Sequence, residues 1–228
     1  GTHTISLVLE SDTGNTSQTF TKTLIVQNTP PEINTDEMSI FPSEGVFGEA
    51  TFDFVGKATD FHTLTYEWSS NLDGVLSTSA EFSTGDLTVG YHDLTFKAID
   101  DHGEISSYTY SNGIWVKSRP TVVIVSDTIT PEDTDVLFTA IASDMDGTIG
   151  YYLWKINGQD ASDESSFFTT SFTEPGIYNV SVLVKDNDEL AQTSYIEIMV
   201  LDVPDVTVNY ETVHEEGDGF VAGEEEYV

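Results

Sequence analysis

The sequence contains no cysteine. This absence excludes disulfides, thiolate metal sites and cysteine nucleophiles, but it does not exclude export, because disulfides are optional in exported proteins. Basic residues are scarce: seven lysines and arginines stand against 40 aspartates and glutamates, which gives a formal net charge of −33. A field of this sign repels phosphate backbones and anionic lipid head groups. We therefore expect cations as partners and no nucleic acid.

Long apolar runs are also lacking. No stretch of about eighteen apolar residues and no signal peptide with a charged front is present, so we expect no direct membrane insertion in this segment and place any export signal or anchor outside the chain. The acidic residues are interleaved with Ser, Thr and apolar residues, which is typical of a folded protein. Salt or divalent cations would screen their repulsion. These features favour an extracellular, cell-surface location, in a halophilic or archaeal setting or on a cation-rich surface.

Catalytic motifs are the third absence. The sequence has no G-x-S-x-G, H-E-x-x-H or glycine-rich phosphate loop, and its five histidines are scattered along the chain. Acidic pairs are so frequent here that pairing alone carries no information. The sequence therefore indicates that the protein is not an enzyme.

The sequence does contain an internal repeat. Three segments begin with a glycine and then alternate apolar and polar residues: GTHTISLVLESDTG from Gly1, GYHDLTFKAIDDHG from Gly90 and GIYNVSVLVKDNDE from Gly176. The apolar sets are Ile5, Leu7 and Leu9; Leu94, Phe96 and Ala98; and Val180, Val182 and Val184. A period of two predicts half-buried β-strands, and each leads through a turn into a second strand.

The repeat length predicts an all-β fold of tandem β-sandwiches, because about seven short strands fit into roughly 85–90 residues. We expect complete domains at 30–118 and 119–203. Residues 1–29 match only the last two strands of a repeat, and residues 204–228 match only its first strands. We interpret the chain as a segment of a longer tandem array. The alternative is that the terminal pieces complete each other between molecules, as in donor-strand polymers, although neither supplies the middle strands.

Two tryptophans are the expected centres of the cores. Trp68 in YEW and Trp154 in YLW occupy matching places on the third strand of each complete repeat. His92 and Tyr178 each follow a repeat glycine by two residues, where sandwiches of this kind often carry a tyrosine corner. We interpret both as structural.

Together these motifs resemble immunoglobulin-like domains of the PKD type, which are common in secreted and surface proteins of archaea and bacteria. The resemblance rests on YEW and YLW, on the D-x-D-G turn before YLW, and on G-x-Y-x-V-x-V-x-V-x-D in the penultimate strand. The chain lacks the W-x-F-G-D-G turn of the family pattern. The resemblance implies the sandwich fold and says little about function.

One set of carboxylates suggests chemistry. In this topology the loop after the second strand and the loop after the sixth lie at the same end, where the preceding domain attaches. In the second complete repeat these loops carry Asp144 and Asp146, and Asp186 and Asp188. Like charges so close cannot all stay ionised without a cation, and oxygen donors of this kind suit Ca²⁺. We therefore predict a calcium ion that stiffens the junction. The competing interpretation is a solvated turn, with Lys117 and Arg119 neutralising part of the charge.

The first complete repeat has a weaker version of this set, formed by Asp60, Asp100 and Asp101. His62 and His102 stand beside them, and histidine favours transition metals over calcium. Separately, Asn15 and Asn179 begin N-x-S/T sequons and are candidate glycosylation sites if the protein is exported. Asn179 is expected on the solvent face because it alternates with Val180.

Two hypotheses about function follow. The first is a non-catalytic structural or adhesive segment of a larger surface protein, such as a surface layer, filament or appendage. Its partners would be other copies of itself or neighbouring domains of the same chain. The alternative is a glycan- or substrate-binding accessory module of a secreted enzyme. An exposed aromatic strip on one sheet would favour the second hypothesis.

Overall fold

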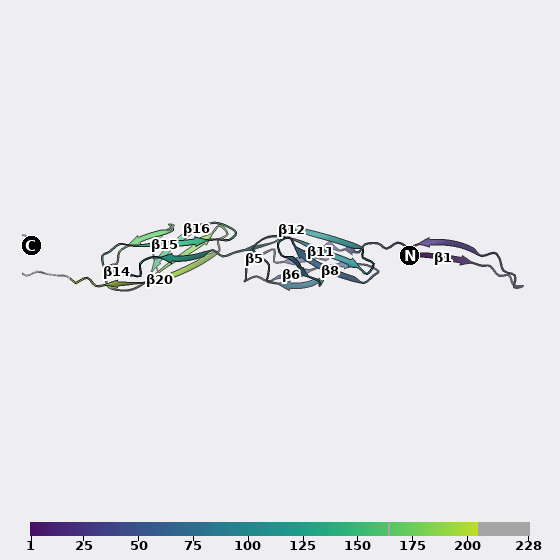
Figure 1. Ribbon diagram of the computed structural model, residues 1–228, viewed down its shortest axis with the longest axis horizontal. Coiled ribbons are helices and arrows are strands. Elements are labelled where there is room, and N and C mark those ends of the chain that lie inside the picture. Colours follow the sequence, from purple (N-terminus) through teal and green to yellow (C-terminus); the bar gives the residue numbers. More distant parts are fainter. Residues whose placement is uncertain (164, 205–228) are drawn as a thin grey trace, which may run out of the picture.

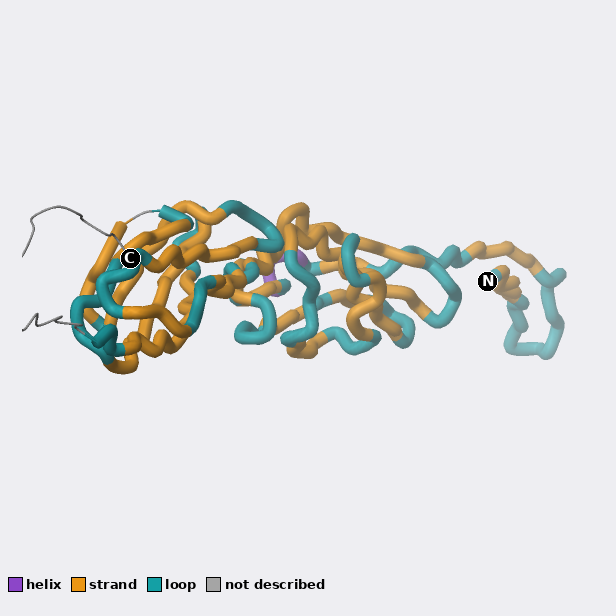
Figure 2. Tube along the Cα trace, turned by 60° about the vertical axis from the view of Figure 1, so that its left-hand side comes forward, coloured by secondary structure: helices purple, strands orange, loops and turns teal. Residues whose placement is uncertain are grey.

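The computed structural model describes residues 1–163 and 165–204. An N-terminal hairpin and two β-sandwiches follow one another along the long axis (Figure 1). The only helical turn in the described residues is the 3-10 turn η1 (Thr35–Glu37), so strands and loops make up the rest (Figure 2). No helix in this part of the chain has the length and apolar character needed to cross a membrane. The predicted unit at 204–228 lies, apart from Pro204, outside the described residues.

The N-terminal hairpin pairs β1 (Thr2–Leu7) with β2 (Phe20–Ile25) in antiparallel register. Every residue of both strands is exposed. The prediction of a half-buried strand is therefore wrong for Ile5, Leu7 and Leu9, which are 55–59% exposed. The alternating pattern is present, but no second sheet among the described residues covers the hairpin.

The first sandwich extends from β3 to β12. Its strands are β3 (Glu32–Ile33), β4 (Ser39–Phe41), β5 (Glu44–Val46), β6 (Phe52–Val55), β7 (Ala58–Thr59), β8 (Leu64–Ser70), β9 (Gly74–Ser77), β10 (Glu81–Thr84), β11 (Gly90–Asp100) and β12 (Ile105–Lys117). The sheet β10-β6-β4 packs against the sheet β5-β12-β11-β8-β9, and β3 pairs separately with β7.

The second sandwich repeats this arrangement with fewer interruptions. Its strands are β13 (Thr121–Val125), β14 (Ile129–Pro131), β15 (Val136–Ser143), β16 (Ile149–Ile156), β17 (Gln159–Asp163), β18 (Phe167–Thr170), β19 (Gly176–Asp186) and β20 (Ala191–Leu201). They form the sheets β13-β15-β18 and β14-β20-β19-β16-β17.

The first strand of each sandwich is divided between the two sheets, which gives the second sandwich eight strands instead of the seven predicted. In the first sandwich the additional short pair β3 and β7 brings the number to ten. In the first sandwich β4 pairs antiparallel with β6, whereas β5 pairs in parallel with β12. In the second, β13 pairs antiparallel with β15, whereas β14 pairs in parallel with β20. Pro42, which has no N–H to donate, lies at the first of these breaks. As a result, consecutive strands (β4 and β5, and likewise β13 and β14) form edge strands of the two opposing sheets.

The two sandwiches have separate cores, which confirms the prediction of tandem domains. One core is formed by Met38, Phe52, Phe54, Trp68, Leu87, Leu94, Phe96, Ala98, Ile114 and Val116. The other is formed by Val136, Phe138, Ala140, Trp154, Phe168, Phe172, Val180, Val182, Val184, Ile198 and Val200. The apolar sets predicted on the strands after Gly90 and Gly176 are all fully buried.

Both predicted hub tryptophans are 0% exposed. Trp68 meets the Phe54 ring edge-on, with 5.3 Å between ring centroids, and its Nε1 donates to Ala80 O at 3.0 Å. Trp154 Nε1 donates to Ser165 O at 2.9 Å. The indole therefore fills the space between the sheets and satisfies its one donor in the same way in both domains.

The two residues assigned to the tyrosine corner make matching contacts. Tyr178 Oη donates to Glu174 O, four residues upstream, at 2.9 Å. His92 is fully buried, and its Nε2 lies 2.8 Å from Thr88 O, again four residues upstream. The acceptor is a carbonyl, so Nε2 carries the proton. The structural interpretation of both residues is confirmed.

Replacement of Tyr178 by phenylalanine is expected to lower the free energy of unfolding of the second sandwich by about 0.5–1.5 kcal/mol, because one hydrogen bond to a backbone carbonyl is lost. Urea unfolding followed by tryptophan fluorescence measures this change. Tyr195→Phe is the control, since that ring is 66% exposed on β20. Equal effects of the two substitutions would contradict a corner role.

Candidate functional site: carboxylates at the domain junctions

The loops that carry the predicted calcium ligands lie together at the end of the second sandwich that faces the first. Asp144 and Asp146 follow β15, Asp186 is the last residue of β19, and Asp188 is in the next turn. Asn187 joins the loops: its N–H donates to Thr148 O at 3.0 Å, and its Oδ1 accepts from Thr148 N at 2.6 Å. The predicted proximity of the two loops is thus present.

A residue of the interdomain linker enters this set of carboxylates. Ser118, only 8% exposed, follows β12 directly. Its N–H donates to Asp146 Oδ1 at 3.0 Å, and its hydroxyl lies 2.8 Å from Asp144 Oδ1 and 2.5 Å from Asp146 Oδ1. A hydroxyl has one proton to donate. Ser118 therefore anchors the linker to Asp144 and Asp146, but its hydroxyl cannot donate a hydrogen bond to both carboxylates at once.

Three buried carboxylate oxygens in this cluster have no hydrogen-bond partner among the residues that the structure describes: Asp144 Oδ2, Asp146 Oδ2 and Asp186 Oδ2. Asp186 is only 3% exposed, and its other oxygen accepts from Asp188 N at 2.7 Å and Leu190 N at 2.9 Å. A buried charged group without a partner is costly. A cation among these oxygens would remove that cost.

The pKa of Asp188 is raised, first by burial and in part by the negative charges of the neighbouring aspartates. Burial raises the pKa of the Asp188 carboxyl, and Lys117 opposes this rise. The negative charges that add to the rise in pKa belong to Asp186, Asp146 and Asp144. The proton is therefore held more tightly than in an isolated aspartate, as expected where carboxylates share a site without a counter-ion.

Gly147 explains the glycine of the D-x-D-G turn. A Cβ at this position would lie 2.0 Å from Asn187 Oδ1 and 2.6 Å from Asp144 Oδ2. The two loops can meet only because residue 147 has no side chain, so the glycine serves close approach of the loops.

The four aspartates are nevertheless spaced too widely to form a tight ligand set. Among the described residues, the one group of three or more acidic, histidine or cysteine side chains with donor atoms all within 4.8 Å of one another is His62, Asp101 and His102. Calcium coordination by all four aspartates would require the loops to close around the ion, which its flexible geometry with oxygens at about 2.4 Å permits.

The first sandwich has a corresponding aspartate with different partners. Asp100 Oδ1 accepts from His102 N at 2.8 Å and Glu104 N at 2.9 Å, as Asp186 Oδ1 does from its own turn. Asp100 Oδ2, however, accepts from Asn28 Nδ2 at 2.6 Å. Burial of Asp100 favours a raised pKa, but the hydrogen bonds from Asn28, Glu104 and His102 outweigh it, so its pKa lies below the usual value. At this junction the linker thus supplies a neutral amide donor to the second carboxylate oxygen of Asp100.

The weaker calcium set is therefore not brought together as one group. Asp60 Oδ1 accepts from its own turn, at His62 N, at 2.8 Å. Asp100 is paired with the linker, and Asp101 lies against two histidines.

The two basic residues named as competitors make their direct contacts outside the cluster but still act on it through their charge. Lys117 opposes the burial that raises the pKa of Asp188, and Asp186 adds to the rise in the pKa of Arg119 that its hydrogen bond to Glu49 causes. Arg119 makes a two-pronged contact with Glu49, at 2.6 and 3.0 Å, and its Nη1 donates to Ala191 O at 3.3 Å. It thereby ties a loop of the first sandwich to the second. Lys117 Nζ pairs with Glu44 at 3.0 Å and lies 4.1 Å from the centroid of the Trp115 ring.

The linker residues Asn28 and Ser118, which donate hydrogen bonds to the aspartates, were not predicted from the sequence, because only the loops were considered. A signal was present: each lies two residues before a proline, Pro30 and Pro120. The two sequon asparagines are both exposed, and Asn179 faces solvent opposite the buried Val180, as predicted. Glycosylation itself stays a prediction.

Comparison with known families decides the type of the second sandwich. Residues 121–196 match the PKD domain family model. The second sandwich is accordingly called the PKD domain below. PKD domains are typically non-catalytic and commonly extracellular.

The solved structures to which this chain is similar include the following three. The fibronectin(III)-like modules of Clostridium thermocellum CbhA are 17% identical, with 79% of this chain and 100% of that chain covered and a TM-score of 0.36. A structure of carbohydrate-binding modules from the β-sandwich superfamily is 28% identical over 37% of this chain and 35% of that chain, with a TM-score of 0.35. The PKD1 domain of Vibrio anguillarum Epp is 26% identical over 39% of this chain and 99% of that chain, with a TM-score of 0.33. No curated protein matches the chain.

Proposed function

We propose that this chain is a non-catalytic structural segment of a larger extracellular protein built from tandem immunoglobulin-like domains, as in a surface layer, filament or appendage. In this proposal Ca²⁺ stiffens the junction before the PKD domain. The single observation that carries the proposal is the position of Ser118. It places the linker between two domains in direct contact with carboxylates that have buried, unpartnered oxygens.

The chemistry of the site suits calcium. Asp144, Asp146 and Asp186 would hold the ion through their free oxygens, and Asp188 lies close enough to be coupled to all three. The donors are hard oxygens, which is the preference of Ca²⁺. Because Ser118 already contacts two of these aspartates, an ion there would fix the linker as well as the loops. The two domains would then move less against each other.

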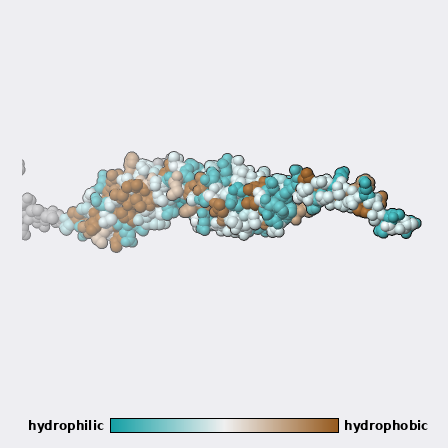
Figure 3. Space-filling view, turned by 45° about the vertical axis from the view of Figure 1, so that its right-hand side comes forward, coloured by the Kyte–Doolittle hydropathy of each residue, from teal (hydrophilic) through white to brown (hydrophobic). Residues whose placement is uncertain are grey.

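The outer face of the PKD domain supports assembly with a second copy of this chain. Val123, Val125, Leu137, Ile141 and Phe167 lie on the outer face of the sheet β13-β15-β18, and each is 53–62% exposed. Val123 and Ile141 are directly paired, so the patch is continuous across strands. Figure 3 shows that hydrophobic residues gather more over the PKD domain than over the first sandwich.

The corresponding face of the first sandwich is more polar but not wholly so, because Phe41, which pairs with Asp53, is 72% exposed on it. Asp53, Glu81 and Ser83 occupy the places of Leu137, Phe167 and Thr169. In a chain with a net charge of −33, an uncharged apolar face is where two copies can approach with least repulsion, and exposed patches of this kind mark interaction sites. This contact would serve the assembly role.

The glycan-binding alternative has less support. Its best observation is the pair Tyr91 and Trp115, whose rings stack at 4.9 Å with 13° between their planes. Tyr91 is 52% exposed, but the Lys117 ammonium covers part of Trp115. Two rings with one of them partly covered form a smaller platform than the aromatic strip expected for a glycan site.

A distance measurement tests the stiffening. Because the chain has no cysteine, Ser107→Cys and Thr169→Cys would introduce one spin label on each domain with no background. We expect the distribution of label distances to narrow when Ca²⁺ is added after chelator treatment. Asp186→Asn should abolish the narrowing. The matched control is Asp127→Asn, in the β13–β14 loop. Equally broad distributions with and without Ca²⁺ would rule the proposal out.

A further inference from the structure

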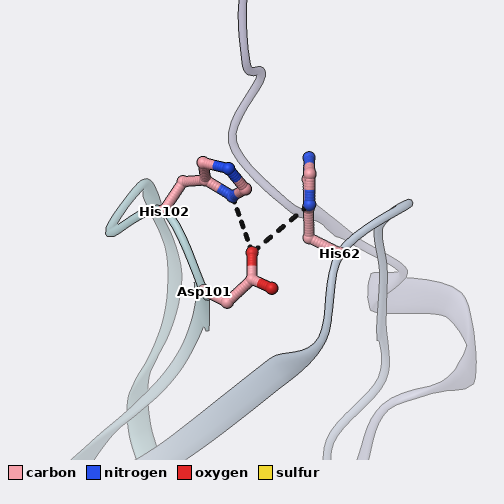
Figure 4. Close-up of side chains that lie close together, drawn as sticks. All are labelled: His62, Asp101 and His102. Carbon is pink, nitrogen blue, oxygen red and sulfur yellow. Dashed lines mark hydrogen bonds and ion pairs between the residues drawn. The ribbon is translucent and has the colours of Figure 1, made fainter. Parts of the chain in front are cut away.

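Two loops at the opposite junction bring two histidines and a carboxylate together. His62 lies in the loop after β7, and Asp101 and His102 form the turn between β11 and β12. His102 Nδ1 is 2.6 Å from Asp101 Oδ1, and His62 Nδ1 is 3.3 Å from the same oxygen. Figure 4 shows both ring nitrogens directed at that oxygen. The imidazole centroids are 4.2 Å apart.

The backbone holds both histidines by the same device. Asp60 Oδ1 accepts from His62 N and Asp100 Oδ1 accepts from His102 N, each at 2.8 Å. Both loops therefore have the pattern Asp-x-His, with the aspartate fixing the turn that presents the histidine. These turns fix the backbone at both histidines, so the two loops present their imidazoles side by side.

The same loops of the PKD domain carry Asp-x-Asp instead. Asp186 and Asp188 replace Asp100 and His102, with the same hydrogen bond from the amide two residues on, at 2.7 Å. Asp144 and Asp146 replace Asp60 and His62. One loop geometry thus presents hard oxygens at one junction and imidazole nitrogens at the other. Imidazole selects zinc, copper and nickel, whereas carboxylates suit calcium.

We propose that His62, Asp101 and His102 bind a first-row transition metal ion of the Zn²⁺ class. Tetrahedral Zn²⁺ with bonds of about 2.0–2.1 Å holds its ligand atoms about 3.3 Å apart. The His62–Asp101 separation already has this value, whereas the His102–Asp101 separation of 2.6 Å has to lengthen when the ion enters. A metal needs a lone pair on Nδ1 of each histidine, and a neutral imidazole supplies it when its proton is on Nε2.

The site would be three-coordinate in protein ligands and open on one side. The side chains of Asp101 and His102 are 52% and 55% exposed, so water would take the remaining position. The ion would cross-link the two loops next to the contact between Asn28 and Asp100. It would thereby secure the first junction by a chemistry separate from that proposed for calcium, and it does not depend on the calcium proposal.

Titration of the full chain with Co²⁺ and Zn²⁺ tests the site. Ca²⁺ is kept at millimolar concentration so that the carboxylates elsewhere are occupied. We expect one equivalent of Co²⁺ to give visible absorption bands of a low-symmetry site, and Zn²⁺ to displace it. Mutation of a residue that only supports a metal ligand typically weakens metal binding about 10–100-fold. His62→Ala and His102→Ala remove ligands themselves, so each should weaken binding at least as much. His3→Ala, which removes an exposed histidine of β1, should leave binding unchanged.

Two outcomes would overturn the site. One is the absence of a saturable equivalent in the unmodified chain, and the other is equal binding by the His62, His102 and His3 variants. Melting of each variant without metal shows whether it is folded. Independently, sub-stoichiometric Co²⁺ should broaden the NMR signals of residues around His62 and His102 before those around Asp144 and Asp186. The reverse order would assign the metal to the carboxylates instead.

Discussion

Replacement of Trp154 by alanine is expected to destabilise the PKD domain strongly and to leave the stability of the first sandwich unchanged. The indole is 0% exposed and lies 6.1 Å from the Phe138 ring and 5.9 Å from the Phe168 ring, measured between centroids. Removing it leaves a cavity between the two sheets, which typically costs about 3–5 kcal/mol. Small domains have a total stability of about 5–15 kcal/mol. The expected loss is therefore between about a fifth and the whole of the stability of a small domain.

Calorimetry of the full chain checks this result, because the two cores share no residue and should melt as two transitions. Trp154→Ala is expected to lower the melting temperature of the PKD domain only. Trp68→Ala is expected to lower that of the first sandwich only. Trp115→Ala is the matched control: it removes the same side chain from a partly exposed position on β12. A single transition that shifts equally in all three variants would contradict the separation of the cores.

The second large effect concerns calcium. At a Ca²⁺ concentration one hundred times its dissociation constant, an ion that binds only the folded state raises the free energy of unfolding by about 2.7 kcal/mol. We expect this rise in the transition of the PKD domain, which supplies Asp144, Asp146 and Asp186. The first sandwich should respond less, because Asn28 already donates to Asp100.

The effect of Asp186→Asn on the melting temperature of the PKD domain should change sign when Ca²⁺ is added. The amide oxygen can still accept from Asp188 N and Leu190 N, so the turn is kept, while one buried negative charge is removed. Without Ca²⁺ the variant should therefore melt at or above the temperature of the unmodified chain. With Ca²⁺ it should melt below it, because the variant has lost a ligand. Gly147→Ala, which separates the loops by steric contact with Asn187, should also lose the calcium response, and Asp127→Asn should keep it. Coincident melting curves of the unmodified chain with Ca²⁺ and with chelator would exclude the site.

Much of the fold could be predicted because its signals are local. Alternation along Leu94, Phe96 and Ala98 requires only that successive side chains of a strand point to opposite faces, and all three residues are buried. The same pattern in Ile5, Leu7 and Leu9 gave a strand but not its burial, since burial depends on a second sheet. The division of the first strand between two sheets was missed, because it depends on which partner each half meets.

The candidate sites show the same limit. Knowledge of the topology placed the loops of Asp144 and Asp186 at one end, but sequence proximity gave no indication that Ser118 would lie between them. The sequence likewise gave no indication that Asp60, Asp100 and Asp101 would have separate partners. Asp100 accepts a hydrogen bond from Asn28, 72 residues away, and Asp101 contacts the two histidines.

By itself, the sequence determined the all-β class, the repeat, the tryptophan hubs and the excess of negative charge. These follow from side-chain periodicity and composition, which need no knowledge of distant partners. Only the tertiary structure decided which carboxylate oxygens are left without donors and which are satisfied by the linker. It also decided that imidazoles converge at one junction and carboxylates at the other. Such contacts join segments tens of residues apart, and their geometry exists only once the sheets have packed and the loops at their ends have been brought together.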